Sequence, residues 1–318
     1  MLKSIRPQIP KILLRAIVAF AFLLCVSMSA APRIESSGDE AAAYRASVEK
    51  WRQEYEADLT SDHGWLTISG LFWLHEGENK FGSDPTNDIV LPESAPADAG
   101  YFEFHAGKTI AHIKPGVVAT MNGKPVDTAE LLPDSRLGHT RPSDARLVLG
   151  SLTLWVHASG DRYTIRLRDP NSALRRDFHG LTWFSIDESY RVVARFVAYD
   201  QPKQVPIQNL AGDSLELPIS GYVIFSLHGQ ELRLDAQPDK DGGLTFVIRD
   251  LTSGKETYAA ARFLDTDAPK DGTVVLDFNE AYNPPCAYNP YTTCPLPPPG
   301  NRLRTRIEAG EKMYRRDH

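Results

Sequence analysis

The chain has 318 residues, with 35 Lys and Arg against 41 Asp and Glu, which gives a net charge of −6. A chain of this acidity has no overall attraction for nucleic acid or anionic lipid, so we expect no nucleic-acid partner. Its length is enough for one large β domain or two domains of ordinary size.

Residues 1–30 have the three parts of a secretory signal peptide in order. Four basic residues come first, then an uncharged apolar run and a stretch of small residues: Lys3, Arg6, Lys11 and Arg15, then 16–26, then 27–31. The apolar run is shorter than the roughly 20 residues that span a bilayer. We therefore predict a periplasmic or secreted protein with a cleaved signal peptide and no stable membrane anchor. An uncleaved amino-terminal anchor is the alternative.

Processing would change both the charge and the cysteine content. Removing residues 1–30 takes away four of the 35 basic residues and none of the 41 acidic ones, so the net charge becomes −10. Only Cys286 and Cys294 then remain. In an oxidising compartment, two cysteines this close in sequence predict a local disulfide, which would contribute about 2.5 kcal/mol.

Residues 31–60 read as a flexible leader followed by an amphipathic helix that begins near Ser37 or Asp39. Apolar and aromatic residues recur there at spacings of three and four: Tyr44, Val48, Trp51, Tyr55 and Leu59. Such a stripe is typical of a docking surface. We expect this helix to lie against a β body and assign it no catalytic role.

From residue 61 the period changes to two, which indicates β-strands. The strands expected in residues 61–170 are 64–68, 100–105, 108–113, 117–121, 151–157 and 163–168. Asn122-Gly123 predicts a tight hairpin. Since no long helix fits between these strands, they should pair as an antiparallel β-sandwich.

A charged joint at residues 171–178 precedes a second antiparallel β-sheet lobe, residues 171–318. Its expected strands are 191–199, 222–227, 231–235, 244–249, 256–263 and 273–278. Residues 283–300 are rich in proline, which excludes a helix interior or a central strand. They should form a long irregular loop.

The chain lacks a glycine-flanked nucleophile elbow, a glycine-rich phosphate loop and a two-histidine zinc motif, so we predict neither a metal nor another cofactor. Polar residues gather instead at the strand ends and loop between 249 and 302. We predict Asp277 and Glu256 as acid and base, with Arg262 or Arg302 as an anion clamp. The expected binding residues are Arg249, Asp250, Tyr258, Asn279, Tyr282, Asn283 and Arg302.

Two alternatives apply to the same segment. A long loop leaves backbone groups without ladder partners, and the Asp, Asn, Arg and Tyr side chains would then serve only to hold it down. Cys286 as a nucleophile is disfavoured because no His lies near it in sequence. A metal held by Cys286 and Cys294 with Asp277 is a further alternative, although two thiolates are too few for a structural zinc site.

Several motifs resemble the bacterial family known as domain of unknown function 1684, DUF1684. They are 64–66 with 70–74 (Gly-Trp-Leu, Gly-Leu-Phe-Trp-Leu), 79–83 (Asn-Lys-Phe-Gly-Ser), 277–286 (Asp-Phe-Asn-Glu-Ala-Tyr-Asn-Pro-Pro-Cys), 293–298 (Thr-Cys-Pro-Leu-Pro-Pro) and 301–303 (Asn-Arg-Leu). The resemblance implies no established activity.

The first half is also similar in motif order to forkhead-associated (FHA) sandwiches. The motifs are 79–83, 87–91, 121–123 and 147–150. Those domains read phosphothreonine with an Arg directly after the first Gly, where this chain has Ser83. The resemblance therefore implies a shared scaffold without phosphopeptide reading.

Together these features predict an exported, soluble, mainly β protein with a ligand-binding or structural role in the cell envelope. A small-molecule ligand is the expected partner. The alternative is a hydrolase acting on a small polar or envelope-derived substrate, with a carboxylate and arginine site at the carboxyl-terminal loop.

Overall fold

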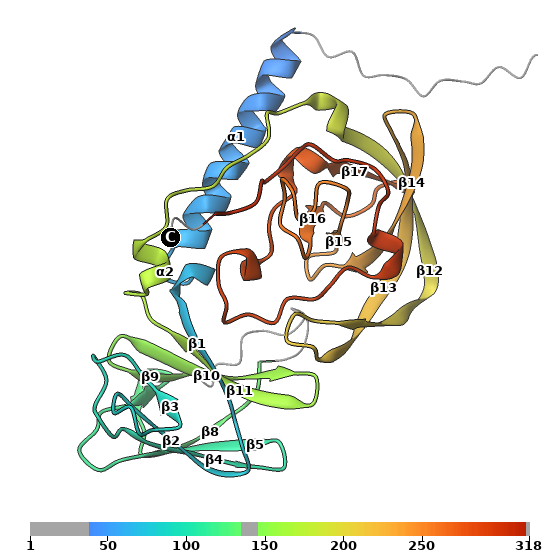
Figure 1. Ribbon diagram of the computed structural model, residues 1–318. Coiled ribbons are helices and arrows are strands. Elements are labelled where there is room, and N and C mark those ends of the chain that lie inside the picture. Colours follow the sequence, from blue (N-terminus) through green and yellow to red (C-terminus); the bar gives the residue numbers. More distant parts are fainter. Residues whose placement is uncertain (1–37, 135–145, 316–318) are drawn as a thin grey trace, which may run out of the picture.

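The computed structural model describes residues 38–134 and 146–315, and the predicted signal peptide lies outside them. One long helix, α1 (Gly38–Thr60), precedes two β lobes, which Figure 1 shows with the second lobe above the first and α1 running along the side of the second. As expected, α1 docks through its aromatic stripe: Tyr55 donates to the Asn283 carbonyl, and the rings of Trp51 and Tyr282 lie 6.2 Å apart. Only Val48 and Leu59 are buried on this helix.

The first lobe is a sandwich of two sheets. One sheet has the order β1-β11-β10-β9-β6-β7 and the other β3-β2-β4-β5-β8. Every pair is antiparallel except β2 with β3. The strands are β1 (Ile68–Trp73), β2 (Gly77–Gly82), β3 (Ile89–Val90), β4 (Gly100–His105), β5 (Lys108–Ile113), β6 (Thr120–Met121), β7 (Lys124–Pro125), β8 (Thr128–Leu131), β9 (Leu147–Leu149), β10 (Leu152–Ser159) and β11 (Arg162–Arg168).

The sandwich core forms because alternate residues of each strand face inward. Phe81 and Phe102 stack in it with ring centroids 4.4 Å apart, and Leu154 and Ile165 contribute from the other sheet. The predicted hairpin at Asn122-Gly123 is confirmed. Both residues have positive φ, 53° and 72°, as a tight two-residue turn requires.

The second lobe is one antiparallel sheet of order β16-β15-β14-β13-β12-β17 that curls around its own core. A short α2 (Ala173–Arg176) and the 3₁₀ turn η3 (Glu188–Tyr190) connect the lobes. The strands are β12 (Arg191–Gln208), β13 (Ser214–Leu227), β14 (Gln230–Pro238), β15 (Leu244–Ile248), β16 (Arg262–Thr266) and β17 (Thr273–Asp277).

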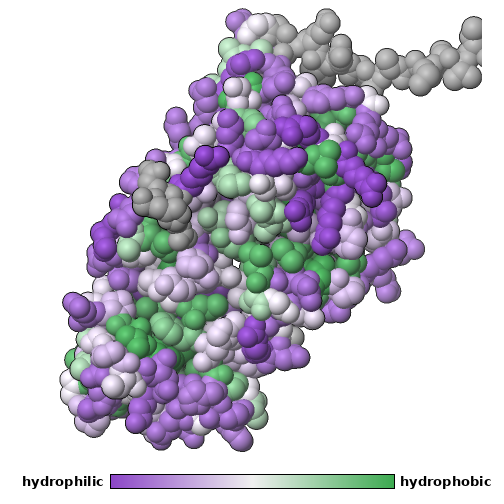
Figure 2. Space-filling model, in the orientation of Figure 1, coloured by the Kyte–Doolittle hydropathy of each residue, from purple (hydrophilic) through white to green (hydrophobic). Residues whose placement is uncertain are grey.

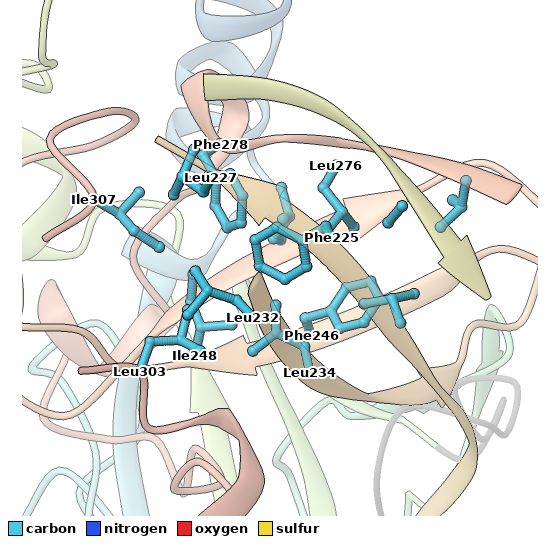
Figure 3. Close-up of a cluster of buried hydrophobic side chains, with 14 of the residues drawn as sticks. Phe225, Leu227, Leu232, Leu234, Phe246, Ile248, Leu276, Phe278, Leu303 and Ile307 are labelled. Carbon is cyan, nitrogen blue, oxygen red and sulfur yellow. The ribbon is translucent and has the colours of Figure 1, made fainter. Parts of the chain in front are cut away.

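Large apolar side chains from the sheet and from the carboxyl-terminal segment fill the second core. Figure 3 shows Phe225, Leu234 and Phe246 of the sheet meeting there, while Leu303 and Ile307 close one side. Residues 278–315 contain no strand, which confirms the expected irregular loop. They include only short 3₁₀ turns: η4 (Phe278–Glu280), η5 (Pro285–Ala287) and η6 (Pro299–Asn301).

Two predicted strands are wrong. Residues 65–67 form the 3₁₀ helix η1 (Trp65–Thr67), because Gly64 O accepts from both the backbone N–H and the hydroxyl of Thr67, at 3.2 and 2.7 Å. Residues 256–261 are not a strand either. Thr252 O accepts from three successive N–H groups, those of residues 255–257, which closes a compact turn. In addition, the strand expected over 117–121 is reduced to β6.

The structure is thus mainly β, with antiparallel sheets and one long amino-terminal helix. Within the described residues, no helix is long and apolar enough to cross a membrane. Figure 2 shows apolar residues gathered between the lobes and on the first lobe, which lies below. Hydrophilic residues cover most of the second lobe, above, and of α1.

Candidate functional site

Two residues of the predicted site, Arg262 and Asp250, form a buried pair in the second lobe. The Arg262 guanidinium lies 3.5 Å from Asp250 and donates to the carbonyls of Ile307 and Ala309. Asp250 accepts from the Ile307 N–H at 2.6 Å and from the Thr252 hydroxyl at 2.7 Å. These contacts hold the carboxyl-terminal segment onto the sheet. We call these residues, 250 and 262 with 307–309, the anchor.

The predicted acid and base lie on different elements with different partners. Asp277 accepts from the Tyr44 hydroxyl at 2.8 Å and from the Asn279 N–H at 3.1 Å, and lies 3.6 Å from Arg191. Glu256 is exposed and pairs with Arg306 at 2.7 Å. Asp277 therefore ties α1 to the end of β17, whereas Glu256 pairs with the carboxyl-terminal segment, and the two carboxylates share no partner within the described residues.

Most of the predicted binding residues also make loop-holding contacts. Asn283 donates to the buried Glu311 through its backbone N–H and its side-chain amide, both at 2.7 Å. Tyr258 donates to the Cys286 carbonyl at 3.2 Å. The side chains of Arg249 and Arg302 are exposed, and their backbones form a β-bridge.

The predicted disulfide is not formed. Cys286 and Cys294 are free thiols, Cys286 partly buried and Cys294 buried. They hydrogen-bond to each other, which raises the pKa of Cys286 and lowers that of Cys294; burial further raises the pKa of Cys286. Loop 283–300 is thus held by hydrogen bonds, and no covalent staple contributes.

A cavity of about 570 Å³ lies between the two lobes. The outer face of the sandwich sheet forms one wall, and the ends of β14, β15 and β16 form the other, with residues 292–295 of the loop at its edge. Among the predicted site residues, Tyr282 and Cys294 line it. Its volume is in the range of small-molecule sites, about 300–1,000 Å³.

The sandwich wall is polar because of strand alternation. Leu154 and Val156 of β10 point into the sandwich core, as does Ile165 of β11. Successive side chains point to opposite faces, so His157 and Arg166 must face the other way, toward the second lobe. Both line the cavity.

Three side chains on this wall form a continuous hydrogen-bonded relay. His157 Nδ1 lies 2.7 Å from Asp134 Oδ1, and His157 Nε2 lies 2.9 Å from the Thr293 hydroxyl oxygen. The indole of Trp155 donates to the other Asp134 oxygen at 2.8 Å. A hydroxyl, an imidazole and a carboxylate in this order are the nucleophile, base and orienting group of hydroxyl-based acyl transfer.

The protonation states suit that order. Burial would raise the pKa of Asp134, but the hydrogen bond from His157 and the charges of His157 and Arg166 keep it below its ordinary value. Burial lowers the pKa of His157 and outweighs the opposing hydrogen bond to Asp134. At neutral pH an ionised Asp134 therefore accepts the Nδ1–H of a neutral His157, whose Nε2 is left to accept the Thr293 proton.

Arg166 is a buried cation with few partners. It is 5% exposed, and its Nε has no hydrogen-bond partner. Within the described residues its guanidinium makes no hydrogen bond and has one ion pair, 3.9 Å from Asp134. Burial lowers the pKa of Arg166, as expected for a cation removed from water. An under-paired guanidinium beside a cavity can bind a carboxylate or phosphate.

Thr293 reaches His157 because both lobes hold its loop. Asn289 donates to the carbonyls of Trp65 and Ile68 in the first lobe, at 2.8 and 2.7 Å. In the second lobe, Pro295 forms a β-bridge with Asn209 at the end of β12. These contacts fix residues 289–295 across the gap between the lobes.

Sequence reasoning missed Asp134, His157, Arg166 and Thr293. The first three fall on ordinary strand or loop positions, and Thr293 lies 136 residues from His157. The absence of a His near Cys286 in sequence did not exclude a His near this loop in space. His157 contacts Thr293, the residue before Cys294. The proline content of residues 283–300 and the 293–298 motif pointed to this loop, but neither indicated a role for Thr293.

Residues 176–312 match the family described as "Protein of unknown function (DUF1684)", which supports that family for the second lobe and the loop. No curated protein matches the chain. Among solved structures, the chain is similar to the solution NMR structure of an uncharacterized protein from Haloarcula marismortui, with 34% identity over 43% of this chain and 78% of that one, at a TM-score of 0.37. The forkhead-associated likeness and the restriction to bacteria stay predictions.

Proposed function

We propose that the protein is a hydrolase that cleaves an ester or related acyl bond of a small molecule in the cavity between its lobes. The observation that carries this proposal is the Asp134–His157–Thr293 relay, with successive contacts of 2.7 and 2.9 Å. The proposal assigns hydrolase activity to a different group of residues from the predicted Asp277, Glu256 and Arg262.

The relay would cleave the substrate in two steps, acylation of Thr293 and hydrolysis of the acyl-threonine. Thr293 Oγ1 attacks the substrate carbonyl carbon while its proton passes to His157 Nε2, and the bond to the leaving oxygen breaks as His157 returns that proton to it. Water then attacks the acyl-threonine ester with His157 again as base, which releases the acid and restores the hydroxyl. Asp134 stabilises the imidazolium formed in each step.

Arg166 gives the substrate class. A buried guanidinium with an unpaired Nε binds an anionic group better than a neutral one, because the ligand supplies acceptors that the protein lacks. We therefore propose a substrate that carries a carboxylate or phosphate.

A covalent probe tests the hydrolase. A fluorophosphonate forms a bond from an activated hydroxyl oxygen to phosphorus and releases fluoride. We expect it to modify Thr293 in the full protein, as read by peptide mass spectrometry. Thr293→Val should abolish the modification, and His157→Gln should slow it by about 10²–10⁴-fold.

The chain offers a matched control. Ser189 and His228 form a second hydroxyl–imidazole pair, 3.1 Å apart, but on the exposed surface and outside the cavity. Ser189→Ala should leave the labelling of the protein unchanged. Absence of label at Thr293, or labelling that is indifferent to His157→Gln in a variant of unchanged melting temperature, would overturn the proposal.

A binding protein without chemistry is the second candidate, and the under-paired Arg166 favours it. The two differ in one measurement. A pure binding protein would bind an anionic ligand but show no covalent labelling of Thr293 by the fluorophosphonate, whereas the hydrolase would be labelled.

We further propose that the protein is exported and acts in the periplasm or outside the cell, with residues 1–30 removed. The signal-peptide pattern of those residues supports this. Amino-terminal sequencing of the protein from a fractionated secreting host should find a start near residue 30 or 31. An intact Met1 terminus in the cytosolic fraction would contradict export.

A further inference from the structure

The cavity has a second polar wall, opposite His157 and Arg166, which the proposed chemistry does not use. Gln237 and Asp239 come from the end of β14 and the turn after it, and Asp265 comes from β16. Charge therefore differs across the cavity: Arg146 and Arg166 lie on the sandwich side together with Asp134, whereas the charged residues on the side of the second lobe are the carboxylates Asp239 and Asp265.

Asp265 is a carboxylate held by neutral groups. One of its oxygens accepts from the Thr245 hydroxyl and the other from the Tyr282 hydroxyl, each at 2.6 Å. Among residues 38–134 and 146–315, no Lys, Arg or His forms an ion pair with it. Two hydroxyl donors orient this exposed carboxylate, which has no cationic partner among the described residues.

Gln237 is an independent sign that this wall meets a ligand. It is 8% exposed, lines the cavity, and its side-chain amide nitrogen is buried without a hydrogen-bond partner. An unpaired buried donor costs about 1–3 kcal/mol, a cost that a ligand carbonyl in the cavity would remove.

We propose that this wall is a second subsite, which binds the ammonium group of the substrate at Asp265 and Asp239 while Gln237 donates to a neighbouring carbonyl oxygen. The inference rests on the proposed function and narrows its substrate. With an anionic group at Arg166 and an ammonium group across the cavity, the substrate is dipolar: an amino-acid conjugate or a short peptide-like compound.

The size and the apolar lining agree with that class. About 570 Å³ accommodates a small molecule of this kind with its charged ends on opposite walls. Trp65, Phe263 and Leu215 line the same space and can cover a short carbon skeleton. A divalent cation fits less well, since no cluster of three or more potential metal ligands occurs within the described part of the chain.

Three related probes test the subsite by calorimetry on the full-length Thr293→Val variant, which cannot turn over an acyl substrate. They are zwitterionic alanyl-alanine, its N-acetyl derivative, which keeps only the negative charge, and its carboxyl-terminal amide, which keeps only the positive charge. We expect the zwitterion to bind at least tenfold more tightly than either derivative.

Added substitutions assign each charge to its wall. Asp265→Asn in the same background should remove the penalty for N-acetylation, and Arg166→Met should remove the penalty for amidation. Asp239→Asn is the second variant, used if Asp265→Asn lowers the melting temperature. An N-acetyl derivative that binds as tightly as the zwitterion, or a zwitterion that does not bind at 10 mM, would overturn the subsite.

The outcome is separable from that of the hydrolase. If the fluorophosphonate labels Thr293 but the zwitterion is not preferred, the subsite proposal is wrong and the hydrolase proposal stands. If the zwitterion is preferred but Thr293 is not labelled, the cavity is a binding site for dipolar molecules and the hydrolase proposal is wrong.

Discussion

Two arginines of this protein are equally buried and have opposite surroundings. Arg262 of the anchor is 1% exposed, pairs with Asp250 and donates to two carbonyls of the carboxyl-terminal segment. Arg166 beside the cavity is 5% exposed, has one ion pair at 3.9 Å and leaves its Nε unpartnered. Burial alone therefore does not distinguish a charge that holds the fold together from one that is free to bind a ligand, whereas the number of satisfied donors separates these two arginines.

The difference has an energetic meaning. Removing a cation from water costs several kcal/mol, and good pairing with further hydrogen bonds offsets that cost. The anchor has this pairing within the protein. The cavity lacks it, so its arginine is held at a cost that a bound anion would relieve.

The largest expected effect is on the free energy of unfolding. Arg262→Met should lower it by about 3–5 kcal/mol, because Asp250 and the carbonyls of residues 307 and 309 are left without their cation. Arg166→Met should change it by about 1 kcal/mol or less, since Asp134 keeps His157 and Trp155 as donors. Urea denaturation measures both, and equal losses would break the comparison.

The pH dependence of stability is the next test of the comparison between the anchor and the cavity. Burial raises the pKa of Glu311, near the anchor, to about 7. A carboxyl whose folded pKa lies above its unfolded value contributes stability that is present below about pH 4.5 and lost as pH rises toward 7. Wild type should lose roughly 3 kcal/mol from this group over that window.

Glu311→Gln isolates that loss. The variant has no titrating group at this position, so wild type should lose unfolding free energy relative to the variant between pH 5 and pH 8. Denaturation curves at both pH values measure it. A difference that is constant with pH would mean that Glu311 titrates normally.

The predicted acid and base give a smaller contrast. Asp277→Ala removes the acceptor for Tyr44 and for the Asn279 N–H, and should lower the unfolding free energy by about 1–3 kcal/mol. Glu256→Ala removes an exposed pair with Arg306 and should leave the melting temperature unchanged. Neither should alter the labelling of Thr293. Lost labelling in a stable Asp277→Ala variant would restore the role predicted from sequence.

The smallest effect concerns the pH profile of the relay. Burial lowers the pKa of His157, so the imidazole stays neutral, and able to act as a base, below its ordinary pKa of about 6.5. The rate of Thr293 labelling should therefore stay constant through pH 6.5 and fall only at lower pH. A fall centred above pH 6.5 would show that the hydrogen bond to Asp134 raises the pKa of His157 by more than burial lowers it.

Much of the fold follows from local patterns in the sequence. The 3.6-residue stripe of Tyr44 and Trp51 predicted α1, and Asn122-Gly123 predicted its hairpin, because each signal lies within a few residues. Strand ends were less predictable. Gly64 and Thr252 each gather several hydrogen bonds into a turn, and a period of two does not show such turns.

The candidate site was largely unpredictable for a physical reason. His157 and Thr293 meet only because two sheets and a loop fold around one gap, and no local pattern reports a contact between residues 136 apart. Sequence analysis found a dense polar segment at 249–302 and also allowed that its side chains hold the loop down. The contacts of Arg262 and Asn283 are of that second kind.

Thr293 lies in residues 289–295, the part of the loop that bridges the two lobes, and this position has a consequence for biosynthesis. Thr293 is synthesised 136 residues after His157, its proposed base. A nascent polypeptide, or one still crossing a membrane unfolded, would carry the imidazole and carboxylate without the nucleophile beside them. Under the proposed function, such a chain would be inactive until loop 283–300 has packed between the lobes, and cleavage within residues 289–295 would inactivate it again.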